Sequence, residues 1–385
     1  MRTISKLTVL MLVACAWAAR VDARSKAAPA AETLGGLCEA SAARFVPCHD
    51  EPARSCLLVG DNERDELYFT AESPSQLPAA PTLQLVTAGS AVEVDDIEAL
   101  EVLDGEVWVV GSHGRKRWLT PEQLQEKKKK DPDAKQCDRD KGRLNLFHGR
   151  WGADHKVTGT AITTAKSAWE TLLRDKCTSD LFALAANDDA GRKLAASACA
   201  AFKRADEAAK DEQAACDGGF NIEGAAAIPD ARGVKRLWLG LRAPVVDGKA
   251  LLLRLAKDAT TLRFDGIAAV ALPGPPAIRE LAYAGKHLWV IAGPMADANV
   301  AFTLAVVDVA ALESGATLTA RAVDELPNSS EGLAIEPDGS HAIVITDGAE
   351  RKKPGTGAAP ESLCPEKPKG ACCTDSTYLR VPLPD

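Results

Sequence analysis

The chain alternates short apolar runs with turn residues, and one pattern of this kind recurs four times. In each copy a glutamate is followed by small or apolar residues, a turn and a second apolar run. The copies are 96–100 leading to 107–111, 221–225 leading to 237–240, 278–282 leading to 288–291, and 330–334 leading to 342–345. Turn residues such as Asp104-Gly105 and Pro337-Asp338-Gly339 separate the two runs. Each copy therefore predicts a β-hairpin.

The spacing of the copies predicts how the hairpins assemble. The last three copies recur after roughly 50–60 residues, which is enough for four short strands with their loops. Units made of one small sheet bury both faces only when they stack radially, as in a propeller. Residues 56–61 and 66–69 predict strands of an earlier unit, and residues 377–381 could pair with an N-terminal strand to close the ring. The prediction is an all-β protein, a β-propeller of about five blades, with six as an alternative.

A helical insertion is predicted between the first two copies. Residues 164–216 are rich in Ala, Lys, Asp and Glu and place leucines at helical spacing. Cysteines of this region are expected to pin the helices to the propeller. They are Cys137, Cys177, Cys199 and Cys216. Residues 351–385 form a second Cys-rich segment, which we expect to close a propeller domain covering residues 24–385.

The N-terminus has the pattern of an export signal. Arg2 and Lys6 precede an apolar run over residues 7–19, which is too short to span a bilayer. Small residues at Val21 and Ala23 predict cleavage after Ala23, so that residues 1–23 are a signal peptide. The alternative is a lipobox over residues 12–15, which would make Cys15 a lipid anchor. The apolar run continues beyond this cysteine, which favours cleavage after Ala23.

Composition and charge agree with export. The 385 residues carry a formal net charge of −8, and 46% of them are hydrophobic. The acidic balance argues against a nucleic-acid-binding protein, which needs a basic face. Eleven cysteines are many for a reducing compartment, and losing Cys15 with the signal peptide leaves an even number, as a complete disulfide framework requires. No stretch is apolar over enough residues to predict a transmembrane helix. We therefore expect an exported protein, periplasmic or secreted.

Several motifs together resemble a known family. They are residues 96–99 followed by 111–115, then 218–224, 239–251 and 278–283. In order and approximate spacing they look like bacterial domain-of-unknown-function family 3616, over roughly residues 55–350. The family is similar to exported propellers and has no established activity, so the resemblance implies a fold and a compartment only. The Cys-rich tail and the Cys-containing helical region depart from it.

The repeated glutamates are the first candidate site. They are Glu98, Glu223, Glu280 and Glu331. If each begins the innermost strand of a blade, the four surround one axis, where like charges need a cation, protons or hydrogen-bond donors. Calcium is the natural candidate because it accepts many oxygen ligands in irregular geometry, and Asn221 and Asp61 could add oxygens. In the alternative interpretation the glutamates accept hydrogen bonds from backbone N–H groups of the neighbouring blade, without a metal.

A second set of residues could perform chemistry at the same end of the channel. His113 could act as a general base, while Arg242 and Arg279 could bind a phosphate or carboxylate. The alternative is that residues 112–114 are a simple turn and the arginines pair with the glutamates. We therefore predict an exported binding or scaffold protein, with a metal ion as an option, whose partner is a protein or a small anionic ligand. The competing hypothesis is a metal-dependent hydrolase of lactone or phosphoester type.

Overall fold

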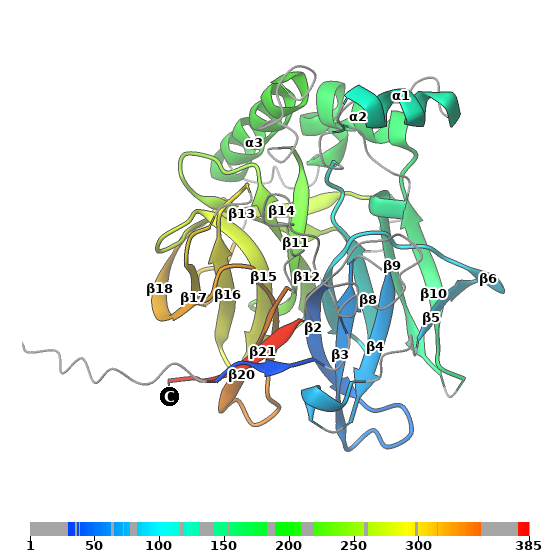
Figure 1. Cartoon of the computed structure of the whole chain (residues 1–385). Coiled ribbons are helices and arrows are strands. Elements are labelled where there is room, and N and C mark those ends of the chain that lie inside the picture. Colours follow the sequence, from blue (N-terminus) through cyan, green and yellow to red (C-terminus); the bar gives the residue numbers. More distant parts are fainter. Residues whose placement is uncertain are drawn as a thin grey trace, which may run out of the picture.

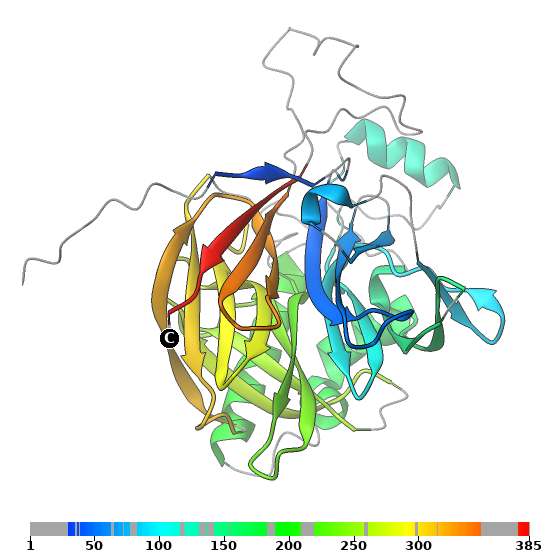
Figure 2. The same ribbon diagram turned by 90° about the horizontal axis from the view of Figure 1, so that it is seen from below.

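Five blades of mainly antiparallel strands surround one axis in the computed structural model of the chain, and a parallel pair of edge strands joins the third and fourth blades into one eight-stranded sheet (Figures 1 and 2). The structure describes residues 30–34, 37, 39–62, 65–71, 73–77, 83–115, 119, 121–130, 137, 142–152, 154–182, 189–208, 219–257, 261–296, 299–313, 315–347 and 376–384. The predicted signal peptide, Cys15, Cys216 and most of the predicted closing segment lie outside these residues. Seen from below in Figure 2, the blades follow one another around the axis in chain order.

The strands of each blade are consecutive in sequence, apart from the additions at the edges of blades 2 and 5. Blade 1 consists of β2 (Ala40–Pro47), β3 (Ser55–Asp61) and β4 (Glu66–Thr70). Blade 2 consists of β7 (Ile97–Leu103), β8 (Glu106–Gly111), β9 (Asn145–Trp151) and β10 (Lys156–Thr163), extended by β5 (Gln84–Thr87) and β6 (Ser90–Ala91). Blade 3 consists of β11 (Asn221–Pro229), β12 (Lys235–Ala243), β13 (Ala250–Leu255) and β14 (Phe264–Ala271). Blade 4 consists of β15 (Ala277–Ala284), β16 (His287–Gly293), β17 (Phe302–Asp308) and β18 (Thr317–Leu326). Blade 5 consists of β19 (Ser330–Ile335), β20 (His341–Thr346), β21 (Thr377–Pro382) and β1 (Glu32–Thr33).

The first strand of each blade lines the axis. β2 packs beside β7, β7 beside β11, β11 beside β15, β15 beside β19, and β19 returns to β2. These strands are buried on both faces, and small residues allow their close approach. At Gly224 a Cβ atom would lie 2.8 Å from Cγ of Leu281 on the next blade, so only glycine fits there. The closed ring confirms a β-propeller, and the described residues form five blades.

The last blade combines both ends of the chain. Glu32 and Thr33 of β1 pair with Tyr378 and Thr377 of β21, and the Tyr378 hydroxyl donates to Glu32 at 2.7 Å. Figure 2 shows the red C-terminal strand next to the blue N-terminal one. The predicted closure by residues 377–381 is therefore confirmed. Because the ring closes through hydrogen bonds between the two ends, separating the ends opens a blade.

The predicted insertion is helical. It contains α2 (Lys166–Asp175), the short π-helix η3 (Cys177–Leu181) and α3 (Asp189–Ala208), which lie at one end of the propeller (Figure 1). A further helix, α1 (Pro121–Lys130), belongs to the β8–β9 connection, which also contains the one-turn helix η2 (Gly142–Leu144). Another single turn, η1 (Pro74–Gln76), follows β4. Buried Trp169, Phe202 and Phe220 form one aromatic cluster, and α3 packs on β14. The insertion thus extends the core of blades 2 and 3.

Two disulfides join described residues. Cys48 pairs with Cys56 across the turn between β2 and β3, and Cys177 pairs with Cys199. Cys137 is also disulfide-bonded. The prediction that Cys177 and Cys199 pin the helices to the propeller is wrong: they bond to each other, because η3 folds back on α3. Among the described residues, none of the helices is long and apolar enough to cross a membrane.

Replacing both Cys177 and Cys199 by alanine is expected to lower the free energy of unfolding by about 3 kcal/mol, because the bond closes a loop of 22 residues in the unfolded chain. The shorter Cys48–Cys56 loop should give a smaller effect when the same exchange is made there. Urea unfolding followed by circular dichroism measures both. Equal losses in the two double variants would contradict the loop-length argument.

Candidate functional site

Each inner strand carries an irregularity at the same place. Where the strand pairs with the second strand of its blade, the register skips one residue. The skipped residues are Ser41 in β2, Glu98 in β7, Glu223 in β11, Arg279 in β15 and Glu331 in β19. A bulge of this kind leaves one residue unpaired and turns its side chain away from the regular alternation. We call these five residues the axial layer, since the inner strands that carry them surround the axis.

Three of the four predicted glutamates belong to the axial layer. In blade 4 the layer position is Arg279, and Glu280 is the next residue, in regular register with Ile291. In blade 4 the repeated glutamate therefore lies one residue after the bulge position, so an alignment of the repeats on their glutamates misplaces this blade by one residue. The reason is that the bulge, which sequence does not mark, decides which side chain enters the layer.

The two predicted arginines neutralise carboxylates of the layer. Nε of Arg279 lies 2.8 Å from Oε2 of Glu223, and the same guanidinium pairs with Glu331. Nη1 of Arg242 donates to Oε1 of Glu223 at 2.8 Å, and the Asn221 amide donates to the same oxygen at 3.2 Å. The interpretation in which the arginines pair with the glutamates thus describes the structure. Both guanidinium groups are committed to protein carboxylates.

Glu98 differs from the other two glutamates of the layer. Its side chain is only 8% exposed, and it forms no hydrogen bond or ion pair with any residue that the structure describes. Burial, followed by the charges of Asp96, Glu223 and Glu331, raises the pKa of the Glu98 carboxyl well above its usual value, while Arg279 lowers it only in part. Glu98 is the layer's uncompensated carboxyl group.

A second acidic group adjoins the layer at blades 1 and 5. Asp347 directly follows β20, and fully buried Asp61 ends β3. Burial and the charges of Glu331, Glu39 and Asp61 raise the pKa of Asp347 to about 9. Oδ1 of Asp347 is buried without a hydrogen-bond partner among described residues. Asp347 was missed by the sequence analysis. Its position could have indicated it, because Asp347 follows the second strand of blade 5 and Asp61 ends the second strand of blade 1.

Glu280 has a structural role. It is fully buried and accepts hydrogen bonds from the backbone N–H groups of Leu281 at 2.8 Å and of Ala225, in the neighbouring blade, at 3.4 Å. Burial raises its pKa well above the usual value, and the charge of Arg44 opposes this shift. For Glu280 the metal-free alternative, a backbone hydrogen bond between blades, describes the structure.

Arg44 connects four blades and was missed by the sequence. From β2 its guanidinium donates to the carbonyl oxygens of Leu100 at 3.0 Å, Ala225 at 2.9 Å and Leu281 at 2.6 Å. Nε also lies 3.7 Å from the Glu101 carboxylate. No sequence signal marks Arg44, because blade 1 lacks the repeated glutamate that identifies the other inner strands.

His113 lies in the interface between blade 2 and the helices. Its Nδ1 is 2.8 Å from the Gly111 carbonyl oxygen, and its ring packs edge-on against Trp169, with centroids 5.4 Å apart, and against Phe220 at 6.3 Å. The side chain is 1% exposed. An imidazole held in this way supports packing of the helices more directly than proton transfer to a ligand.

The described residues were compared with the arrangement of side chains that a metal ion needs. No three acidic, histidine or cysteine side chains among them are arranged as ligands around one point. Buried oxygens in or beside the layer that have no hydrogen-bond partner among described residues include Oδ1 of Asn221, Oε2 of Glu223, Oε2 of Glu280 and Oδ1 of Asp347. The structure therefore brings together Glu98, Glu223 and Glu331 with both arginines, and assigns Glu280 and His113 to packing and hydrogen bonding elsewhere.

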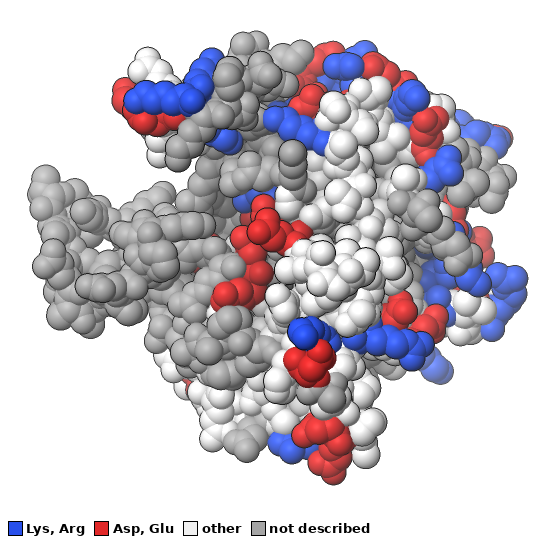
Figure 3. All heavy atoms as spheres, turned by 90° about the vertical axis from the view of Figure 1, so that its right-hand side faces the viewer, with Lys and Arg blue, Asp and Glu red and all other residues white. Residues whose placement is uncertain are grey.

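The outer surface carries charges of both signs. On the face drawn in Figure 3, one group of acidic side chains lies near the centre, and further acidic and basic side chains are mixed around it. Exposed ion pairs include Lys156 with Asp154 at 3.0 Å and Arg174 with Asp175 at 2.9 Å. Such exposed pairs contribute little to stability.

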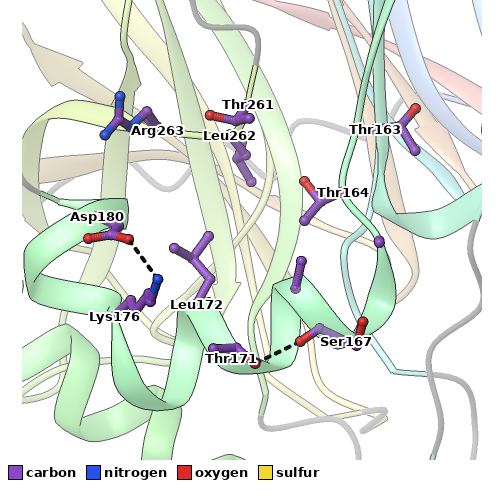
Figure 4. Close-up of a pocket in the computed structure, with 12 residues that line it drawn as sticks. Thr163, Thr164, Ser167, Thr171, Leu172, Lys176, Asp180, Thr261, Leu262 and Arg263 are labelled. Carbon is purple, nitrogen blue, oxygen red and sulfur yellow. Dashed lines mark hydrogen bonds and ion pairs between the residues drawn. The ribbon is translucent and has the colours of Figure 1, made fainter.

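A cleft of about 570 Å³ separates α2 from residues 261–263 (Figure 4). Figure 4 shows Leu172 and Leu262 pointing into it, with Thr164 at its side. Lys176 and Asp180 pair with each other at its edge, 3.7 Å apart. A second cleft of about 570 Å³ lies between blades 3 and 4 around Tyr283. None of the candidate site residues that the sequence predicted lines either cleft.

Comparison with solved structures finds similar chains at low identity. They include a GH43 β-xylosidase/α-arabinofuranosidase from a compost microbial metagenome (8% identity, TM-score 0.42, covering 92% of this chain and 94% of that one). Regucalcin from Agrobacterium tumefaciens, a calcium-binding protein, gives 12% identity and a TM-score of 0.35 over 92% of this chain and 94% of its own. A gluconolactonase from Xanthomonas campestris gives 10% and 0.35 over 91% and 89%. At these scores the likenesses carry no argument about the chemistry of this chain.

Sequence comparison gives a more definite result. No curated protein matches the chain. One family model, described as a protein of unknown function (DUF3616), matches residues 62–327, which include the bulges of blades 2, 3 and 4 and all of the described helices. The resemblance seen in the sequence motifs is thereby confirmed, and the chain belongs to the DUF3616 family.

Proposed function

We propose that the protein is an exported binding module that holds a cation in the axial layer, next to Glu98. The observation that carries this proposal is that Glu98 is nine-tenths buried and unpaired among described residues, while its neighbours in the layer are neutralised. The cost of burying an unpaired charge raises the pKa of the Glu98 carboxyl group and opposes its ionisation. A bound cation removes that cost.

The charges around Glu98 support the same conclusion. Asp96 pairs with Arg143 at 2.6 Å, and Arg242 and Arg279 are committed to Glu223 and Glu331. Every arginine in this neighbourhood therefore already has a carboxylate, and Glu98 is left over. The charge of Asp61 adds to this acidic neighbourhood, whereas Asp347, with its pKa raised to about 9, is protonated and neutral at neutral pH.

Calcium is the metal ion that fits these residues best. It accepts carboxylate and amide oxygens in irregular arrangements. Glu98 could supply a carboxylate, and Oδ1 of Asn221, which is buried without a hydrogen-bond partner among described residues, could supply an amide oxygen. Arg279 in the same layer opposes a second positive charge, so the fit is partial.

Export is supported by two features. The N-terminal residues have the pattern of a signal peptide, and two disulfides join described residues. Disulfides persist in oxidising compartments such as the periplasm or the extracellular space. Cleavage after Ala23 is the route that we propose, with a lipid anchor at Cys15 as the alternative.

Two other hypotheses, a metal-dependent hydrolase and a small anionic ligand, have less support than a bound cation. A general base must reach the reacting group, whereas His113 packs among aromatic rings. Arg242 and Arg279, which were to bind an anion, are paired with glutamates. A protein partner stays compatible with a binding module.

Replacing Glu98 by glutamine is expected to abolish cation binding. A cation that binds only the folded state should stabilise the wild-type protein by about 2.7 kcal/mol when its concentration is a hundred times its Kd. The melting temperature of the wild type should therefore rise, and that of Glu98→Gln should not. Differential scanning fluorimetry with calcium, magnesium and organic ammonium salts measures the effect. Glu106→Gln is the matched control, because Glu106 lies at the opposite end of blade 2 and is a third exposed.

Two outcomes would contradict the proposal. One is a wild-type melting temperature that no cation changes at millimolar concentration. The other is a Glu98→Gln variant that responds to the cation like the wild type. Circular dichroism of the variant without added cation verifies that it is folded, and glutamine, being neutral, should make that state no less stable at neutral pH.

A further inference from the structure

We infer that the cation of the axial layer is an organic ammonium or guanidinium group carried on a short apolar chain, rather than a bare metal ion. The inference rests on the proposed function and adds the chemical class of the ligand. It is carried by three features of the layer and its surroundings. These are the guanidinium already bound there, the unpaired Glu98, and exposed apolar side chains on a connection that is hydrogen-bonded to Arg242.

The layer already binds a guanidinium group of the protein itself. The Arg279 side chain bridges Glu223 and Glu331, from two different blades, and is only 5% exposed. Its Cζ atom lies 5.6 Å from the centre of the Phe302 ring, within reach of a cation–π interaction. A planar cation between carboxylates and an aromatic ring is thus the arrangement that these strands favour.

Glu98 is a carboxyl group at the same position of its strand, but no guanidinium group of the described residues binds to it. It occupies the bulge position of β7, as Glu223 and Glu331 do in their strands, and it is nine-tenths buried. Among described residues it has no hydrogen bond or ion pair. One monovalent group that donates hydrogen bonds is enough to neutralise one carboxylate.

A bare divalent ion fits the layer less well. Calcium needs six to eight oxygens that converge on one point. The described residues supply no group of three acidic, histidine or cysteine side chains with that geometry, and Arg279 places a positive charge in the same layer. An ammonium or guanidinium carries one charge, which is spread over several donors, and it suffers less repulsion.

One connection that carries exposed apolar side chains is hydrogen-bonded to Arg242. The only large apolar side chains that are exposed among described residues are Val234, Met295 and Val300. Met295 and Val300 belong to the connection between β16 and β17, and the Met295 carbonyl oxygen accepts a hydrogen bond from Arg242 at 2.6 Å. Arg242 in turn contacts Glu223, so this connection is tied to the layer. An alkyl chain attached to the cation would find apolar contact there.

Titration calorimetry of the wild-type protein with n-butylguanidinium, n-butylammonium, calcium chloride and neutral n-butanol tests the inference. We expect the two organic cations to bind, butanol not to bind, and calcium to bind at least tenfold more weakly than butylguanidinium. Glu98→Gln should weaken the organic cations at least tenfold, and Glu106→Gln should leave their affinity unchanged.

The other outcomes separate the two proposals. Binding of calcium without the organic cations would overturn this inference and leave the proposed function standing. Binding of no cation at all would overturn both. Organic cations that bind Glu98→Gln as tightly as wild type would show that their site is elsewhere, which also overturns the inference. The wild-type comparison needs no variant, so a Glu98→Gln protein that fails to fold does not prevent a decision.

Discussion

Replacing Arg44 by methionine is expected to lower the free energy of unfolding by about 3–5 kcal/mol, as measured by urea unfolding. Arg44 is 7% exposed and donates hydrogen bonds to carbonyl oxygens of three other blades. Its charge also lies 3.7 Å from Glu101 and 3.9 Å from Glu280. Methionine fills similar space but leaves these carboxyl groups and carbonyls without their donor.

The matched control is Arg380→Met. Arg380 forms two hydrogen bonds to Glu336, both 2.7 Å, but its side chain is 53% exposed. An exposed ion pair contributes little to stability, so this variant should unfold almost as the wild type does. Arg44→Lys should recover only part of the loss, because one ammonium cannot reproduce the planar arrangement of donors. Equal stability losses for Arg44→Met and Arg380→Met would show that the buried contacts do not hold the ring together.

Replacing Asp347 by asparagine is expected to make the protein more stable, by a margin that grows with pH. Asp347 has a pKa of about 9 in the folded protein and about 3.8 in the unfolded chain. Between these values the folded state keeps a proton that the unfolded state has released. Stability therefore falls as the pH rises, by about 1.4 kcal/mol per pH unit for one proton. Asparagine is neutral and removes this contribution.

Urea unfolding at pH 5, 7 and 9 tests the prediction, with the difference between variant and wild type as the measured quantity. Asp338→Asn is the control in the same blade. Asp338 is exposed, and hydrogen bonds from Ser340 lower its pKa, so that its contribution is present above the unfolded pKa and lost only in acid. The Asp338→Asn difference should stay constant from pH 5 to pH 9. If the Asp347→Asn difference were also constant, Asp347 would be ionised in the folded protein at neutral pH.

The architecture could be predicted from the sequence because it repeats. Four copies of one hairpin pattern, with turn residues such as Asp104-Gly105 and Gly285-Lys286, indicated one-sheet units that have to stack on each other. The pairing of residues 377–381 with the N-terminus followed from the same reasoning, since a ring needs closure. Cysteine pairing did not follow, because it depends on which helices fold back on each other.

The site could be predicted only in part. The sequence by itself determined that acidic side chains recur at the start of inner strands, because hydrophobic and turn patterns locate the strands that carry them. Only the tertiary structure decided that Arg279 takes the position expected for Glu280, since a bulge shifts the register by one residue without a sequence signal. It also decided that Arg44 joins four blades and that Glu98 stays unpaired among described residues. Both depend on contacts between blades far apart in sequence, and no local pattern encodes such contacts.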